Sequence, residues 1–219
     1  MKKLVLSLII LFFAHSLSAQ VFRKFSNEFL NLGVGADAFG MGKAVVASTK
    51  GVNAGYWNPA GLTNIEGTEA SLMHASYFQG IANYDLAAYA TPIDRKSTVA
   101  FYALRFGVDD ILNTTDLIDN QGNIDFNRIS LFSATDYAFN MAYAKKLNKK
   151  GLSIGFNAKV IRRIIGKFAN AWGFGMDFGL QYKSEKYDFG LMVRDATSTF
   201  NAWTINQTEF DKISAAIPG

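Results

Sequence analysis

The sequence predicts an all-β fold, a transmembrane antiparallel β-barrel, from three observations. Strand-like runs of alternating polarity recur after residue 67, and the first twenty residues have the pattern of an export signal. After that signal, no segment reaches the 18 consecutive apolar residues of a membrane helix. Hydrophobic residues make up 49% of the chain and charged residues 18%, below the roughly 25% of soluble domains. An exported chain of this kind is either a soluble β-rich protein or an outer-membrane barrel.

Residues 1–19 form the predicted signal peptide. Lys2 and Lys3 give it a basic start, "LVLSLIILFF" is its apolar core, and "LSA" before Gln20 fits cleavage after Ala19. The apolar run is too short to span a bilayer as a helix. Cleavage removes two lysines from a chain with a formal net charge of +4, so little basic excess remains. We therefore expect no nucleic-acid partner.

Seven strands follow. Three early runs, at roughly 68–79, 82–92 and 98–106, alternate imperfectly, with Arg105 among apolar residues. Four later runs alternate cleanly, with large apolar residues on one face and glycine or polar residues on the other. They are "YAFNMAYAK", "GLSIGFNAKVIRR", "WGFGMDFGLQY" and "YDFGLMVRD". In a membrane barrel the apolar face meets lipid and the small or polar face meets the lumen.

The connections between these strands differ in length in a regular way. If the first strand runs outward, the connections "IDRKS", "KLNKK" and "SEK" lie in the periplasm, and all are short. The long polar stretch 107–133 and everything after Ala196 then lie outside, as in bacterial barrels. This sorting favours a barrel; a soluble β-sandwich is the alternative. Seven strands leave an open edge, so we expect 68–219 to be the first half of a barrel with about 14 strands, in a longer chain.

Residues for catalysis or metal binding are scarce. The chain has no cysteine, and His74 is its only histidine after cleavage, so we expect no catalytic residues, no metal and no cofactor. His74 is interpreted as a wall residue. The Asp/Asn-rich stretch 109–127 lacks EF-hand spacing and is interpreted as a solvated loop, with calcium binding as the alternative. Lys159 and Asp177 fall on the lumen faces of adjacent strands, where they can form a polar pair.

The segment before the first strand contains a rigid turn, "NAGYWNPAGL" at 53–62. Pro59 fixes its own φ and moves Asn58 out of the α region, and Gly61 permits a tight reversal. Tyr56 and Trp57 add rigid rings with polar tips that can wedge against a barrel wall. This turn and "GADAFGMGKAVVA" at 35–47 resemble the N-terminal portion of the PorV/PorQ family of Bacteroidetes outer-membrane proteins, within the FadL-like barrel superfamily. The stretch 106–139 extends the resemblance.

The resemblance implies a hatch. In FadL-like barrels the segment before the first strand folds into the lumen, so residues 20–67 would form a hatch or plug here. Its motif residues would be Tyr56, Trp57, Asn58, Pro59, Ala60 and Gly61. The protein would then lie in the lipid of the cell outer membrane.

The resemblance also implies two functions. One is work with the type IX secretion system, as a component that associates with the translocon barrel or carries secreted cargo. The alternative is a FadL-like channel for uptake of hydrophobic small molecules. A partner-binding protein needs exposed apolar anchors in its outer loops, for which Ile118, Ile124, Phe126 and Phe132 are candidates. A transporter needs an apolar pocket at the hatch, which Phe39, Met41, Tyr56 and Trp57 can line.

Overall fold

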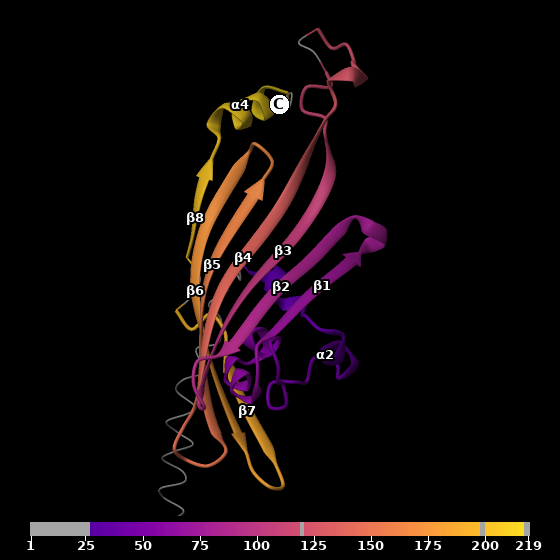
Figure 1. The fold of residues 1–219 in the computed structure, drawn as a ribbon. Helices are drawn as coiled ribbons and strands as arrows, with labels where there is room; N and C mark the ends of the chain where they lie inside the picture. The colour runs from indigo at the N-terminus through magenta and orange to yellow at the C-terminus, as the bar shows by residue number, and fades with distance from the viewer. Residues whose placement is uncertain (1–26, 119–120, 198–199, 217–219) are drawn as a thin grey trace, which may run out of the picture.

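The computed structural model describes residues 27–118, 121–197 and 200–216, and the predicted signal peptide lies outside these ranges. The chain forms one eight-stranded antiparallel sheet that curls into a half-barrel (Figure 1). Its strands follow in sequence order, except that β8 pairs with β6 beyond the end of β7. The strands are β1 (Glu69–Tyr77), β2 (Ala82–Pro92), β3 (Ser97–Asn113), β4 (Ser130–Lys146), β5 (Leu152–Ile165), β6 (Ala169–Lys183), β7 (Asp188–Val193) and β8 (Phe200–Ile205). The prediction of an antiparallel all-β fold is confirmed.

The helices are short, and four of them lie in the N-terminal segment, 27–67. These four are η1 (Glu28–Asn31), α2 (Ala36–Gly40), α3 (Ala54–Trp57) and η2 (Pro59–Asn64). The others are η3 (Phe78–Gly80), η4 (Phe126–Arg128) and α4 (Gln207–Ala216). In the part of the chain that the structure describes, no helix has the length and apolar character to cross a membrane.

The two faces of the sheet differ because side chains alternate along each strand. We call the face that carries the N-terminal segment the inner face and the opposite one the outer face. Inner-face side chains such as Ala138, Ala142 and Asp177 are buried, whereas their outer-face neighbours such as Phe139 and Phe178 are about half exposed. Alternation, which predicted the strands, is therefore the pattern of a sheet covered on one side.

The hydrophobic core lies between the N-terminal segment and the inner face. Val34, Trp57 and Leu62 of the segment belong to the same buried cluster as Tyr84 and Leu104 of the sheet. In Figure 1 the segment, in indigo, lies against the end of the sheet that carries the β2–β3 and β4–β5 turns. The covered end of the sheet is thus fixed by apolar contacts, and the other end stands free of the segment.

The structure corrects the predicted loop at 107–133. Both β3 and β4 contain 17 residues, so 107–113 and 130–133 are strand rather than loop. The register shifts between Val108 and Ile111, and Asp110 has a φ of 57°, which is a β-bulge. The bulge interrupts the alternation, which is why the sequence pattern ended the strand too early.

The structure also corrects the count of seven strands and the predicted loop after Ala196. That region contains β8 and helix α4. β8 is only six residues long, and its alternation gave no clear signal in the sequence.

Candidate functional site

The Asn58 side chain connects the N-terminal segment to two strands. Asn58 is fully buried and extended, and its Oδ1 accepts a hydrogen bond from Ala60 N at 3.1 Å. Its Nδ2 donates to the carbonyl oxygens of Val46 at 2.9 Å and Leu180 at 3.1 Å. A longer contact of 3.4 Å reaches Leu191 O on β7. One amide therefore caps η2 and also binds the backbone of the wall.

Three inner-face glycines make room for this turn. A methyl group at Gly155 of β5 would overlap with Pro59 and with the backbone nitrogen of Ala60. At Gly179, its register partner on β6, a methyl group would overlap with the Asn58 side chain. Gly190 on β7 meets the backbone of residues 46–47 in the same way. The small residues of the inner face are thus the seat of the N-terminal segment.

Tyr56 and Trp57 stabilise the segment itself. The Tyr56 hydroxyl donates to Leu30 O, and Trp57 Nε1 donates to Val34 O at 2.9 Å. The two rings meet edge to face with centroids 4.9 Å apart. Their polar tips therefore bind the segment's own backbone, and their rings belong to the buried cluster that the segment shares with the sheet.

The pair predicted from the sequence, Lys159 and Asp177, forms a buried ion pair on the inner face. Lys159 Nζ lies 2.7 Å from Asp177 Oδ1 and 2.7 Å from Asp195 Oδ1. The Lys159 and Asp177 side chains are 3% and 6% exposed. Asp195 was not predicted as part of this site. Charges this deeply buried depend on one another, because each loses its hydration on burial.

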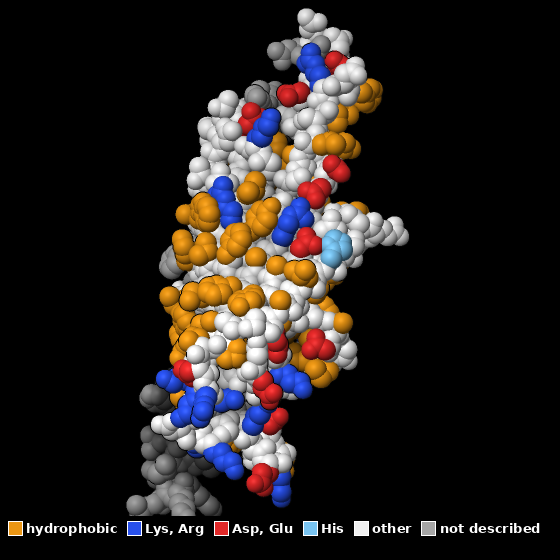
Figure 2. Space-filling view, viewed as in Figure 1, with side chains coloured by type: hydrophobic (Ala, Val, Ile, Leu, Met, Phe, Trp, Pro, Cys, Tyr) orange, Lys and Arg blue, Asp and Glu red, His pale blue; other side chains and the backbone are white. Residues whose placement is uncertain are grey.

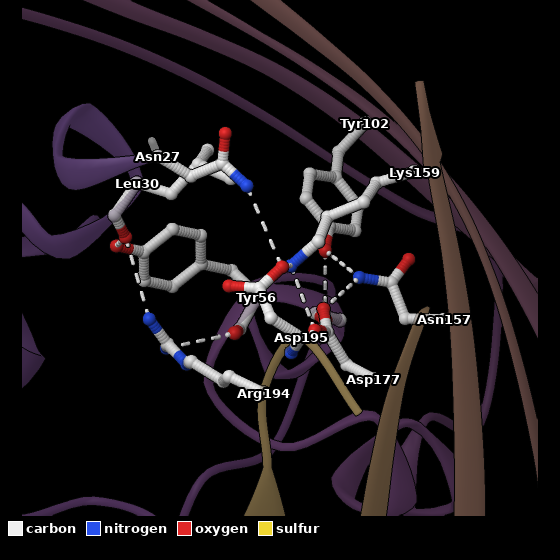
Figure 3. A network of polar contacts seen from close by, with 10 residues as sticks. Asn27, Leu30, Tyr56, Tyr102, Asn157, Lys159, Asp177, Arg194 and Asp195 are labelled. Carbon is white, nitrogen blue, oxygen red and sulfur yellow. Dashed lines mark hydrogen bonds and ion pairs between the residues drawn. The ribbon is translucent and has the colours of Figure 1, made fainter. Parts of the chain in front are cut away.

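Hydrogen bonds extend this charged cluster to the N-terminal segment (Figure 3). Asn157 Nδ2 donates to Asp177 Oδ2 at 2.9 Å and to the Tyr102 hydroxyl at 2.6 Å. The Tyr102 hydroxyl in turn donates to Gly55 O at 3.1 Å. Arg194 approaches from the other side, where its guanidinium donates to Tyr56 O at 3.2 Å and covers the Tyr56 ring. The cluster thus joins β3, β5 and β6 to the segment.

The strand pairing along the edge of β6 is interrupted beside this cluster. Residues Phe178–Lys183 of β6 pair with β7 and residues Ala169–Phe174 pair with β8, so Gly175–Asp177 lie between the two ladders. At this point Asp195 has a φ of 51°, and its backbone N–H donates to Asp177 Oδ1 at 2.8 Å. The sequence had predicted one continuous strand over 187–195, but the chain turns inward after Val193.

The outer face carries a broad apolar belt. Figure 2 shows hydrophobic side chains across the middle of this face, with charged side chains concentrated above and below them. Its exposed members include Phe101, Phe139, Met141, Ile154, Phe174, Met176, Phe178, Phe189 and Leu191. A contiguous exposed apolar surface of this extent marks contact with a membrane or with another protein.

A polar group interrupts the belt on β1–β3. His74 Nδ1 lies 2.6 Å from Asp85 Oδ1, and Arg105 reaches Asp85 at 3.4 Å and Asp109 at 3.1 Å. His74 faces outward, with a side chain that is 66% exposed. The Arg105 that disturbed the alternation in the sequence is thus paired by acidic side chains of its own strand and its neighbour.

The β3–β4 hairpin projects beyond the other strands (Figure 1). Past the bulge, Ile111 pairs with Phe132, and Ile118 and Ile124 form an isolated bridge further on. Of the four predicted anchors, Ile118, Ile124 and Phe126 are 57%, 60% and 72% exposed. Phe132 instead packs edge to face on Phe168 in the β5–β6 turn, with centroids 5.3 Å apart.

The four residues predicted to line a pocket at the hatch differ in burial. Phe39 and Met41 are 39% and 50% exposed, whereas Tyr56 and Trp57 are buried, and Phe39 and Trp57 both lie against Gly33. Within the described ranges, no three acidic or histidine side chains lie close enough to hold a metal ion.

Compared with known proteins, the chain matches no family model and no curated protein.

Proposed function

We propose that this chain forms the wall and hatch of an outer-membrane β-barrel of the PorV/PorQ type. It acts with the type IX secretion system as a component that associates with the translocon or carries cargo. The observation that carries this proposal is the projecting β3–β4 hairpin (Figure 1), whose tip residues Ile118, Ile124 and Phe126 are exposed. The resemblance of the sequence to this family supplies the identity of the partner.

The outer face supports a membrane position. A tilted strand needs about 9–11 residues to cross the hydrocarbon of a bilayer. Strands β3 to β6 contain 14 to 17 residues, enough to cross and extend into water. The apolar belt between charged margins has the pattern of a lipid-facing surface (Figure 2).

The inner face supports a hatch that stays in place. The N-terminal segment shares a hydrophobic core with the sheet, and Asn58 binds the backbone of β6. The buried ion pairs of Lys159 lie where the segment meets the wall. Because so many contacts hold the segment on the sheet, opening a pore would require breaking them. This favours a protein that works through its outer surfaces.

The hairpin tip supports a protein partner. Ile118, Ile124 and Phe126 each expose more than half of their surface to solvent. Apolar and aromatic side chains that are exposed together on a projecting element are the usual anchors of protein interfaces. Fully burying one such side chain contributes about 1.5–3 kcal/mol, so the tip alone can supply several kcal/mol of binding energy.

The test is co-purification of the tagged full-length protein after gentle extraction, followed by mass spectrometry. We expect a very large barrel protein or secreted cargo in stoichiometric amount. The double variant Ile118→Ser, Phe126→Ser should lose it, whereas the control Ile93→Ser should retain it. Ile93 is 59% exposed in the β2–β3 turn, at the opposite end of the sheet. A wild-type protein that carries no such partner, or a tip variant that keeps it, would refute the proposal.

A second candidate function, uptake of hydrophobic small molecules, is favoured by the interruption between β7 and β8. There the wall lacks a regular ladder over Gly175–Asp177, beside the N-terminal segment. A FadL-like channel needs a path of this kind between hatch and membrane. A lone barrel that co-purifies with a hydrophobic small molecule, and without protein, would favour this function.

A further inference from the structure

Arg162 is an outward-facing cation with neutral neighbours. Its guanidinium lies over the ring of Trp172, 4.7 Å from the centroid, and its Nη1 donates to Asn170 Oδ1 at 2.8 Å. In the part of the chain that the structure describes, no carboxylate forms an ion pair with it. By contrast, Arg105 pairs with two acidic side chains and Arg163 forms a two-pronged pair with Asp136. The charge of Arg162 is thus available to a ligand.

An apolar groove lies along the outer face, and its lining on β5 ends at Val160, two positions before Arg162. Its volume is about 570 Å³. Small residues of β5, Ala158 and Val160, form its floor, and larger side chains form its two walls. The walls are Phe139 and Met141 on β4, and Phe174 and Met176 on β6. The groove exists because β5 places small side chains between two strands with large ones.

The cation and the groove are arranged like the two parts of a membrane lipid. Arg162, Val160 and Ala158 follow one another on the same face of β5, each about 7 Å from the next. The groove therefore continues along β5 from the cation, on the face that carries the apolar belt (Figure 2). Headgroup and acyl chain lie in this order in a bilayer leaflet.

We propose that this outer face binds a phosphate-bearing membrane lipid, with its phosphate on Arg162 and Asn170 and an acyl chain over Ala158 and Val160. The inference rests on the membrane position in the proposed function. Arg162 has five N–H donors in a planar fork, a geometry that suits a phosphate. The stacked Trp172 ring and the bond to Asn170 hold the guanidinium in one place, so less side-chain entropy is lost on binding. The apolar groove selects a lipid over a soluble phosphate.

The test uses the full-length protein in detergent micelles, titrated with phosphatidylglycerol or with diacylglycerol of the same acyl chains and followed by native mass spectrometry. We expect wild type to bind phosphatidylglycerol more tightly than diacylglycerol. Arg162→Gln should weaken the binding of phosphatidylglycerol about tenfold, because a hydrogen bond to a charged group contributes about that factor. The binding of diacylglycerol should stay unchanged. Ala158→Phe, which fills the groove, should weaken the binding of both lipids. Both positions face outward, so neither change disturbs the inner core.

Arg128→Gln is the matched control, because it removes one positive charge from the hairpin tip, where Arg128 lies 3.5 Å from Asp125. It should bind both lipids like wild type. The proposal is overturned if Arg162→Gln binds phosphatidylglycerol like wild type. It is also overturned if Arg128→Gln weakens phosphatidylglycerol binding as much as Arg162→Gln does. Flotation of the wild-type protein with phosphatidylglycerol vesicles distinguishes a failure of the proposed membrane position from a failure of the lipid site. Without flotation the membrane position fails; with flotation and no effect of Arg162→Gln, only the lipid site fails.

Discussion

Replacement of Asn58 by alanine tests how the N-terminal segment is held. Asn58 forms three hydrogen bonds of 3.1 Å or less, one as an acceptor and two as a donor to carbonyl oxygens. All of them are lost in Asn58→Ala, and the carbonyl oxygens of Val46 and Leu180 each lose a donor. A net contribution of about 0.5–1.5 kcal/mol for each bond predicts a destabilisation of roughly 1.5–4.5 kcal/mol. The longer contact to Leu191 is left out of this sum.

Asn58→Asp separates the helix cap from the contact with the wall. Aspartate keeps an acceptor for Ala60 N but replaces the amide donor with an oxygen that faces three carbonyls. If the wall contact matters more than the cap, Asp should destabilise the protein at least as much as Ala. If only the cap matters, Asp should be close to wild type, because aspartate is a good N-cap residue.

The assay is urea unfolding of the full-length protein in detergent micelles, followed by tryptophan fluorescence. Trp57, the residue before Asn58, is buried and reports on the segment. Asn148→Ala is the control, because Asn148 is an exposed turn residue that accepts one hydrogen bond from Lys96. It should change the free energy of unfolding by no more than about 0.5 kcal/mol. A loss of less than about 1 kcal/mol in Asn58→Ala would refute our account of this contact.

Four further perturbations test the inner face and one turn. Gly179→Val should displace the Asn58 turn from its seat and expose the segment to limited proteolysis, which wild type should resist. Lys159→Met should destabilise the protein by about 3–5 kcal/mol in urea, because it leaves Asp177 buried without its cation. Deletion of Asn53–Leu62 should make vesicles that contain the protein leaky to small solutes; unchanged permeability would refute the hatch. Backbone N–H groups of the β2–β3 turn lower the pKa of the exposed Asp94 carboxyl, so Asp94 stabilises the turn above its unfolded-state pKa and loses this effect as the pH falls. Asp94→Asn should therefore lower the thermal midpoint at neutral pH, and the difference should shrink in acid.

Period-two alternation was enough to predict most of the sheet. It located β4, β5 and β6 because these strands have one apolar outer face and one face of small or polar residues. It failed at Asp109 and Asp110, where the bulge adds an unpaired residue and changes which face each later residue occupies. A single sequence does not distinguish a bulged strand from a polar loop, so the hairpin extension was missed.

The interior site was only partly predictable. Lys159 and Asp177 were predicted as a pair because alternation places both on the same face of adjacent strands, and in the structure they are diagonal neighbours. Asp195 joins them through an inward turn of the backbone, which no local pattern indicates. The glycines of β5, β6 and β7 were interpreted as a lumen face, but the N-terminal segment that fills the space above them comes from a distant part of the chain.

The inward turn at residues 194–195 has a physical reason in the alternation of β7. Phe189, Leu191 and Val193 face outward, so a straight continuation would place Asp195 in the apolar belt and Arg194 inside. In the membrane position that we propose, a charged side chain in this belt would cost up to about 2–4 kcal/mol, and less for an acidic one. The positive φ of Asp195 breaks the ladder and moves this carboxylate to the inner face, where it pairs with Lys159.

The same turn completes the balance of charge inside. Lys159 and Arg194 are the cations of the cluster, and Asp177 and Asp195 are its anions. Arg194 donates to Leu30 O and Tyr56 O, so the turn also binds the N-terminal segment. The interruption of the wall and the attachment of the segment therefore have one cause. A variant that straightened β7 would loosen the segment at the same time.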